Sequence, residues 1–468
     1  MPALDALCTA LSLPVGVTDR AILADDVALI VALLHARGDL ASLERPRVRF
    51  ALRSVPVIAA AALARLAEPH RFVQLAGPAA VTEASRFLHG FANPVDPHVR
   101  SPYRIRNGKP HVDTVWLEIT NYCNQKCTFC PDMHREDSRQ WLPLAEVKRL
   151  IDELAATVSV GSMQLNAYGE PLLHPHIQEI LAYINEKKLP WPTFFTSHGL
   201  TLVPKKLAQL SNNYPTGIAM SLHNDSQESY AATRSAKLGD YDLLVSRTSD
   251  LLRQMVNEGA ACHMRLYQMV SNNNADWRVD PKVRGAFPDS PERMGAHVRK
   301  WEAIAAEIAA NAPEAVAACA LRNSDQAIAD TFAAATHDDG THLPILEWTD
   351  VKGTRQQAFM SPRPVGSYAN LLLEYHPDWS VGRRVVNPLT CGFVAAPSLA
   401  IFATRKLGIC CLDMNSTGTF GSLDDYPSIA DALMSPEASR MFAQVSNGVA
   451  TSRGCQICLG EGRQLCAK

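Results

Sequence analysis

The sequence predicts an α/β fold, a partial parallel (β/α)6-type barrel with a helical N-terminal extension and a small C-terminal module. Two observations predict it. From Thr114 onward, short apolar runs alternate with amphipathic segments of helical spacing, and this alternation is typical of right-handed parallel β/α units. Residues 1–108 instead carry Ala, Leu and Val at helical spacing and end in a stretch that bears Pro and Gly, which indicates a separate helical piece and a linker.

The barrel elements follow one another along residues 114–270. Apolar runs predict strands at 114–119, 162–168, 193–197, 217–222 and 263–270. Apolar residues at i, i+3, i+4 and i+7 predict helices around 147–154 and 177–184, and a further helix is expected over 242–258. Ligands of parallel β/α folds bind at the carboxyl ends of the strands, so the functional loops are expected directly after these strands.

The pattern divides the chain into successive regions. A helical extension of unknown role is expected at 1–108, the barrel core at 109–325, a connecting segment at 326–386 and a cysteine-bearing module at 387–468. A polar stretch near 337–342 is not assigned to an element.

Composition narrows the class of protein. The formal net charge is -2 and charged residues make up 20%. The charge balance therefore indicates neither the basic surface typical of nucleic-acid binding nor an acidic disordered tail. The N-terminus lacks a positively charged leader, and its apolar stretches are too short to span a bilayer. We therefore expect a cytoplasmic protein with no membrane or nucleic-acid partner. Because the cytosol keeps thiols reduced, the 12 cysteines point to metal or redox chemistry.

A first cysteine cluster follows the first expected strand. Cys123, Cys127 and Cys130 lie on one loop, where three thiolates suit a four-iron cluster and leave one iron open to a small molecule. An amino-acid chelate bound there through its amine and carboxylate would place a sulfonium group beside the cluster. Together with His134, the same cysteines also suit a structural zinc site.

The spacing of these cysteines, with the aromatic Phe129 before the last, resembles the signature of the radical S-adenosylmethionine (radical SAM) superfamily. The resemblance implies a 4Fe-4S cluster and bound S-adenosylmethionine. Downstream, Gly169, Glu170 and Pro171 resemble the family's Gly-Gly-Glu-Pro element, with Tyr168 in place of the first Gly. Backbone groups of such a turn suit the amino group of a bound methionine moiety.

Further positions match the family at the ends of later strands. Ser197 corresponds to its Thr-Asn-Gly-like turn, although His198 follows where Asn is commoner. Ser221 ends the fourth expected strand and Arg234 lies in the next segment. The resemblance implies that Ser221 contacts ribose or carboxylate and that Arg234 pairs with the carboxylate, a task that suits its forked donors. A strand-end Ser that caps a turn and a surface Arg are the structural alternatives.

The C-terminal cysteines resemble a second motif, the twitch or SPASM extension that carries auxiliary iron-sulfur clusters. Cysteine count favours one auxiliary 4Fe-4S cluster, and its expected ligands are Cys391, Cys410, Cys455 and Cys458. Four cysteines of this kind also suit zinc.

Two details of this module are less regular. The usual Asp-Gly hairpin appears here as Thr404 and Arg405. Cys411 adjoins Cys410, and adjacent side chains point in different directions, so one of that pair is expected to be a spectator. Whether Cys411 or Cys466 binds metal stays open.

These resemblances imply an oxidoreductase or maturase. It would cleave S-adenosylmethionine reductively, abstract hydrogen through a 5′-deoxyadenosyl radical and catalyse net oxidation or bond formation. The expected substrate is a peptide or protein side chain or a sugar-like small molecule, and an external donor such as flavodoxin or ferredoxin would supply electrons. No general base is assigned among His134, His198 and His223. The alternative is a non-catalytic metalloprotein that holds structural zinc or carries electrons.

Overall fold

The computed structural model describes most of the chain beyond residue 102. The described residues are 103–234, 237, 239–272, 285–335, 341–364, 396–413 and 415–446, with isolated positions at 27, 31, 84, 393, 451, 452 and 455. The chain divides into two compact units. The first comprises Met1–Arg104, Val385–Pro397 and Leu433–Gly460. The second comprises Ile105–Arg384, Ser398–Ala432 and Glu461–Lys468. Most of the expected N-terminal extension therefore lies outside the described residues.

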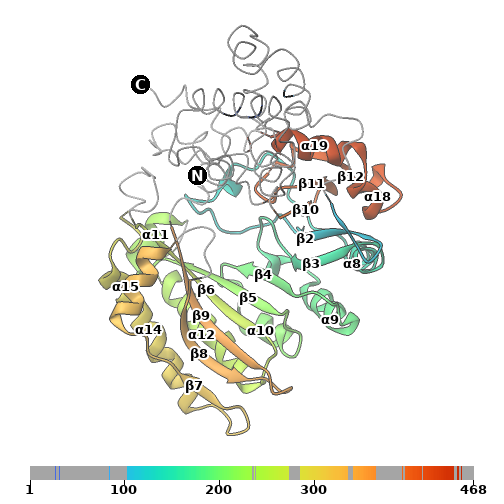
Figure 1. The fold of residues 1–468 in the computed structure, drawn as a ribbon. Helices are drawn as coiled ribbons and strands as arrows, with labels where there is room; N and C mark the ends of the chain where they lie inside the picture. Colours follow the sequence, from blue (N-terminus) through green and yellow to red (C-terminus); the bar gives the residue numbers. More distant parts are fainter. Residues whose placement is uncertain are drawn as a thin grey trace. The chain divides into compact units, whose positions relative to one another are not determined.

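A largely parallel sheet forms the second unit (Figure 1). Six neighbouring strands run parallel: β2 (Lys109–Leu117), β3 (Ser159–Gln164), β4 (Thr193–Ser197), β5 (Gly217–His223), β6 (His263–Val270) and β9 (Arg355–Pro364). Over the described residues the sheet is open rather than closed, in the order β12-β11-β10-β2-β3-β4-β5-β6-β9-β8-β7, with β1 (Ile105–Arg106) paired to β2. The predicted α/β fold with a partial parallel barrel is confirmed.

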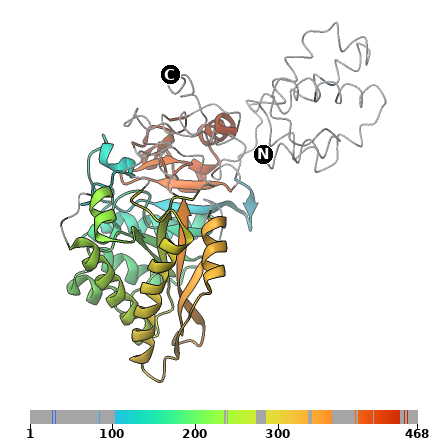
Figure 2. The same ribbon diagram turned by 90° about the vertical axis from the view of Figure 1, so that its left-hand side faces the viewer.

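Helices connect the parallel strands. They are α8 (Leu144–Thr157), α9 (Ile177–Lys187), α10 (Pro204–Leu210), α11 (Gln227–Thr233) and α12 (Asp240–Asn257). Figure 2 shows these helices gathered on one side of the strands. Each amphipathic helix buries the stripe that its sequence spacing predicts, as α8 does with Val147, Leu150, Ile151 and Leu154. None of the described helices combines the length and apolarity that a membrane span requires.

The sixth parallel strand is reached in a way that the sequence pattern does not reveal. After α14 (Pro291–Ala310) come β7 (Ala318–Ala320), α15 (Asp325–Ala334) and β8 (Leu343–Thr349), and β8 runs antiparallel to β9. Pro362 obscures the strand signal in β9, since proline cannot donate to a ladder. The pairing of β9 with β8 ends at Met360, so β6 is the one described strand that adjoins Pro362. Strands β8 and β9 thus fall in the region expected to be a connecting segment.

Residues 398–432 extend the sheet at its other side. Strand β10 (Ser398–Ile401) lies parallel to β2, and β11 (Lys406–Gly408) and β12 (Thr419–Ser422) follow in antiparallel order. The β10–β11 hairpin turns at Arg405, whose φ of 65° is left-handed. Short helices complete the described chain: η1 (Pro131–His134), η2 (Pro171–Leu173), η4 (Leu423–Asp425), α18 (Ile429–Leu433) and α19 (Pro436–Ser446).

Candidate radical SAM site

The first cysteine cluster lies on the loop between β2 and α8, as the sequence predicts. Cys123, Cys127 and Cys130 are all half-buried. The Cys130 amide donates to the Cys127 carbonyl at 3.0 Å, and the Thr128 amide donates to the carbonyl of Thr233, at the end of α11, at 2.8 Å. The loop is therefore tied both to itself and to the segment that carries the predicted anion-binding Arg234.

The chemistry of these thiols fits a cationic metal cluster. Burial raises the pKa of Cys123 to about 12 and raises the pKa values of Cys127 and Cys130, while the Arg234 cation lowers that of Cys127. Three thiolates so close to one another need a compensating positive charge, which a bound metal supplies. Across the part of the chain that the structure describes, no three Cys, His, Asp or Glu side chains converge as ligands of a single metal ion.

The Gly-Glu-Pro turn after β3 packs against the start of the cysteine loop. Gly169 has a φ of 79°, and a Cβ built on it would lie 2.4 Å from the Thr120 carbonyl oxygen. Only glycine fits this left-handed, close approach. The Glu170 amide donates to the carbonyl of Tyr122, next to Cys123, at 2.6 Å, and Pro171 begins η2.

The side chain of Glu170 links neighbouring strand ends. One carboxylate oxygen accepts from the Leu172 amide at 3.1 Å, and the other accepts from the His198 amide, beyond β4, at 2.8 Å. The His198 Nε2 atom lies 2.8 Å from Oδ1 of Asn124, which neighbours Cys123. Ser197 is buried, and its Oγ accepts from the Gly199 amide at 3.0 Å. Ser197 thus caps its own turn.

Beyond β5 the structure brings Ser221 and Arg234 together. Arg234 is buried rather than on the surface, and its Nη2 donates to the Ser221 carbonyl at 2.8 Å. Its guanidinium lies over the ring of Phe129, 5.7 Å from the centroid. Among the described residues, its buried Nε has no hydrogen-bond partner. An unpaired buried donor on a cation indicates a place for an anionic acceptor.

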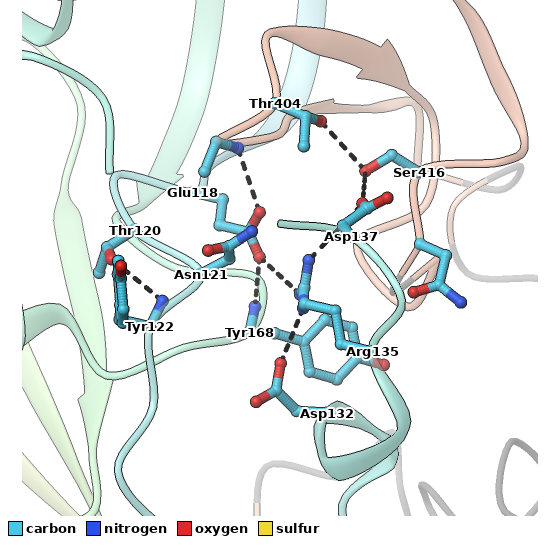
Figure 3. Close-up of polar contacts among 12 residues, drawn as sticks. Glu118, Thr120, Asn121, Tyr122, Asp132, Arg135, Asp137, Tyr168, Thr404 and Ser416 are labelled. Carbon is cyan, nitrogen blue, oxygen red and sulfur yellow. Dashed lines mark hydrogen bonds and ion pairs between the residues drawn. The ribbon is translucent and has the colours of Figure 1, made fainter. Parts of the chain in front are cut away.

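Sequence reasoning missed a buried ion-pair network beside the cysteine loop (Figure 3). Glu118, directly after β2, accepts from Arg135 Nη2 and from the Tyr168 and Ala403 amides at 3.1, 3.2 and 3.1 Å. Arg135 also pairs with Asp132 at 2.9 Å. Burial raises the pKa of the Glu118 carboxyl, against the opposing pull of Arg135 and the two amides. The available signal was a single charged residue within the apolar run of the first expected strand.

Further contacts join the cysteine loop to residues 398–432. The Glu136 amide donates to Oδ1 of Asn415 at 3.0 Å, and Ser416 Oγ donates to Asp137 at 3.4 Å. The Tyr168 hydroxyl donates to the Leu412 carbonyl at 3.3 Å. Tyr168, which stands where the family has its first Gly, therefore reaches the segment that follows Cys410 and Cys411.

The second cysteine set is described only in part. Cys410 is half-buried and Cys411 is buried, both just after β11 in the second unit, and Cys455 belongs to the first unit. Cys391, Cys458 and Cys466 lie outside the described residues, as does the side chain of His134.

Residues 117–246, which include the first cysteine cluster and the strand ends around it, match the family model of the radical SAM superfamily. The match supports membership of this superfamily. Membership of this superfamily supports an enzymatic role for the chain. It implies that the chain uses a 4Fe-4S cluster and S-adenosylmethionine and needs a reductant and a substrate.

Two curated proteins are similar to part of this chain. A GTP 3′,8-cyclase of Chlorobaculum tepidum is 29% identical over 26% of this chain and 36% of its own length. A probable GTP 3′,8-cyclase of Methanothermobacter thermautotrophicus is 36% identical over 17% of this chain and 25% of its own length. The matched region thus spans about a third or less of the length of these curated relatives.

Solved structures are similar at low identity. SuiB of Streptococcus suis bound to its precursor peptide SuiA has a TM-score of 0.42 and 11% identity, covering 82% of each chain. BtrN in complex with AdoMet and 2-DOIA has a TM-score of 0.36 and 10% identity, covering 72% of this chain and 89% of the other.

Proposed function

We propose that this chain is a radical SAM oxidoreductase or maturase whose 4Fe-4S cluster is held by Cys123, Cys127 and Cys130. When bound, the cluster supplies the electron that cleaves S-adenosylmethionine to methionine and a 5′-deoxyadenosyl radical, which abstracts hydrogen from the substrate. One observation carries the proposal. Three half-buried thiols share a loop at the carboxyl end of β2, beside a buried Arg234 whose Nε lacks a partner among the described residues.

The protein's own residues would orient the methionine end of S-adenosylmethionine. Arg234 offers a buried cation for the carboxylate, with Ser221 alongside it. The turn formed by Gly169, Glu170 and Pro171 would face the amino group, because it packs directly on the cysteine loop.

Phe129 and Ser197 would complete this cofactor site. Phe129 is buried before Cys130 and contacts Arg234, so it would shield the cation from water. Ser197 would fix the turn after β4, because its Oγ accepts from the Gly199 amide, and its hydroxyl would still donate to the ligand.

We propose one auxiliary 4Fe-4S cluster held by Cys391, Cys410, Cys455 and Cys458, within a twitch or SPASM-like module at 387–468. Four protein thiolates leave no iron open, so such a cluster suits electron transfer during net oxidation or bond formation. The contact of Tyr168 with the segment after Cys410 supports a link between the two regions. We further propose a cytoplasmic enzyme that takes electrons from a flavodoxin or ferredoxin and acts on a peptide or protein side chain or a sugar-like molecule.

Anaerobic purification and metal analysis test the proposal. A brown protein with about eight irons and eight sulfides per chain is expected for two four-iron clusters. The reduced cluster's electron paramagnetic resonance signal should change when S-adenosylmethionine is added, and Cys127→Ala should abolish that change. Cys319→Ala is the matched control because Cys319 is exposed and distant in sequence from both clusters. A colourless protein that contains zinc would support the non-catalytic alternative instead.

A further inference from the structure

His223 has an unusual backbone at the carboxyl end of β5. Its φ is 59°, and the register between β5 and β6 shifts between Ser221 and His223. A left-handed residue other than glycine costs conformational energy and persists only where its surroundings hold it. Bulges of this kind next to functional sites re-aim a side chain. Contacts around this strand end must therefore hold the left-handed backbone of His223 and direct its side chain.

A buried relay of side chains holds His223 in this conformation. The Gln268 amide donates to the His223 carbonyl at 2.6 Å, and Gln268 Oε1 in turn contacts Nδ1 of His297. Trp301 Nε1 donates to His297 Nε2 at 3.1 Å. Since the indole is only a donor, Nε2 of His297 is an acceptor and its proton sits on Nδ1. That proton fixes which way the Gln268 amide faces.

The ring of His223 meets Arg234. Its Nδ1 lies 3.1 Å from Arg234 Nη2, and a guanidinium can only donate, so Nδ1 accepts and the neutral ring carries its proton on Nε2. Burial and the Arg234 cation lower the pKa of His223 well below its usual value, which keeps the ring neutral. Phe129 contacts the ring edge-on, with centroids 5.3 Å apart.

Several acceptors together fix the guanidinium plane. Nη2 is shared by His223 and the Ser221 carbonyl, and Nη1 donates to the Tyr230 hydroxyl at 3.3 Å. Nε is the buried donor that stays without a partner among the described residues.

We propose that His223 is a positioning residue for Arg234: its Nδ1 holds the guanidinium so that the unpaired Nε–H stays available to the carboxylate of bound S-adenosylmethionine. The inference rests on the proposed function and deepens it. It explains the strained backbone of His223, and it assigns the positioning of the guanidinium to Nδ1 rather than to Nε2.

Paired substitutions separate the two ring nitrogens. Asparagine tolerates left-handed backbone and places an amide oxygen near the Nδ1 position, while glutamine places one near the Nε2 position. In the cluster-loaded full chain, H223G and H223Q should raise the dissociation constant and KM of S-adenosylmethionine about tenfold, with a smaller change in kcat, because a charge-assisted contact is lost. H223N should stay within about twofold of the wild type.

Thermal unfolding of the cluster-free chain provides an independent readout. H223G and H223N should melt at similar temperatures, because both residues accept positive φ. Wild-type affinity in H223G, or rescue by H223Q and not by H223N, overturns the inference while the wild type still cleaves S-adenosylmethionine. Equal losses of affinity and thermal stability in all three variants also overturn it, because they make His223 merely structural. A wild-type protein that binds no S-adenosylmethionine overturns the proposed function and, with it, this inference.

Discussion

Glu118 accepts a hydrogen bond from Arg135 at 3.1 Å, and the side chains of both residues are 0% exposed. The pair joins the end of β2 to the segment directly after Cys130. Because the same carboxylate also accepts from the amide of Ala403, residues 398–432 and the cysteine loop share one buried anchor. The loop that would carry the cluster is thus positioned by a buried ion pair together with a backbone amide that is distant in the sequence.

Replacing Arg135 with Met should destabilise the second unit strongly. The change leaves Glu118 as a buried carboxylate without its cation, which costs about 3–5 kcal/mol. Denaturant unfolding of the cluster-free chain measures this loss. Arg149→Met is the matched control, because Arg149 pairs with Glu146 and Glu153 on an exposed helix face and should lose only about 0–1 kcal/mol. Similar losses in the two variants would show that the buried pair does not anchor the loop.

Gly169→Ala should disrupt the cysteine loop more than backbone strain alone explains. The new Cβ would lie 2.4 Å from the Thr120 carbonyl oxygen, and a backbone atom cannot move aside easily. Gly353→Ala is the control, since its φ of 80° is nearly the same and nothing lies within 4 Å of its Cβ. Gly353→Ala should cost about 1 kcal/mol. Thermal unfolding and iron content after reconstitution should both fall further in Gly169→Ala, and equal effects would argue against close packing at this turn.

Acid should destabilise the fold through His297. Burial lowers the pKa of His297 to about 4 from 6.5. Between these values the unfolded chain binds a proton that the folded chain does not, so the free energy of unfolding falls as pH falls, by about 1.4 kcal/mol per pH unit. The stability is fully present above about pH 6.5. Denaturant unfolding across pH 4–7 should show a shallower pH dependence in His297→Gln, and an unchanged slope would contradict this assignment.

The sequence predicts strands well where a short run is rich in aromatic and β-branched residues, as at 193–197, which forms β4 as expected. It misses the first residues of a strand where those residues are polar. β2 begins at Lys109 rather than 114, because His111 is paired with Ser159 of β3 at 3.0 Å and so joins the sheet despite its polarity. No local pattern reveals such a partner.

In the candidate site too, the sequence predicts features that follow a strand directly but misses contacts between distant residues. The cysteine loop and the Gly-Glu-Pro turn follow from local spacing, because each lies directly after a strand that the sequence marks. The contacts of Arg234 with Ser221 and His223 depend on the bulge in β5, and those of Glu118 depend on residues as distant as Ala403. Such contacts arise from the folded arrangement, which spacing alone does not encode.

Release of 5′-deoxyadenosine by the anaerobically reconstituted, dithionite-reduced chain tests the central claim most directly. The wild type should release it from S-adenosylmethionine, Cys127→Ala should release none, and Cys458→Ala should retain part of the cleavage because only the first cysteine cluster would hold the cosubstrate. Release by Cys127→Ala at the wild-type rate, or none from an iron-loaded wild type, would contradict the account.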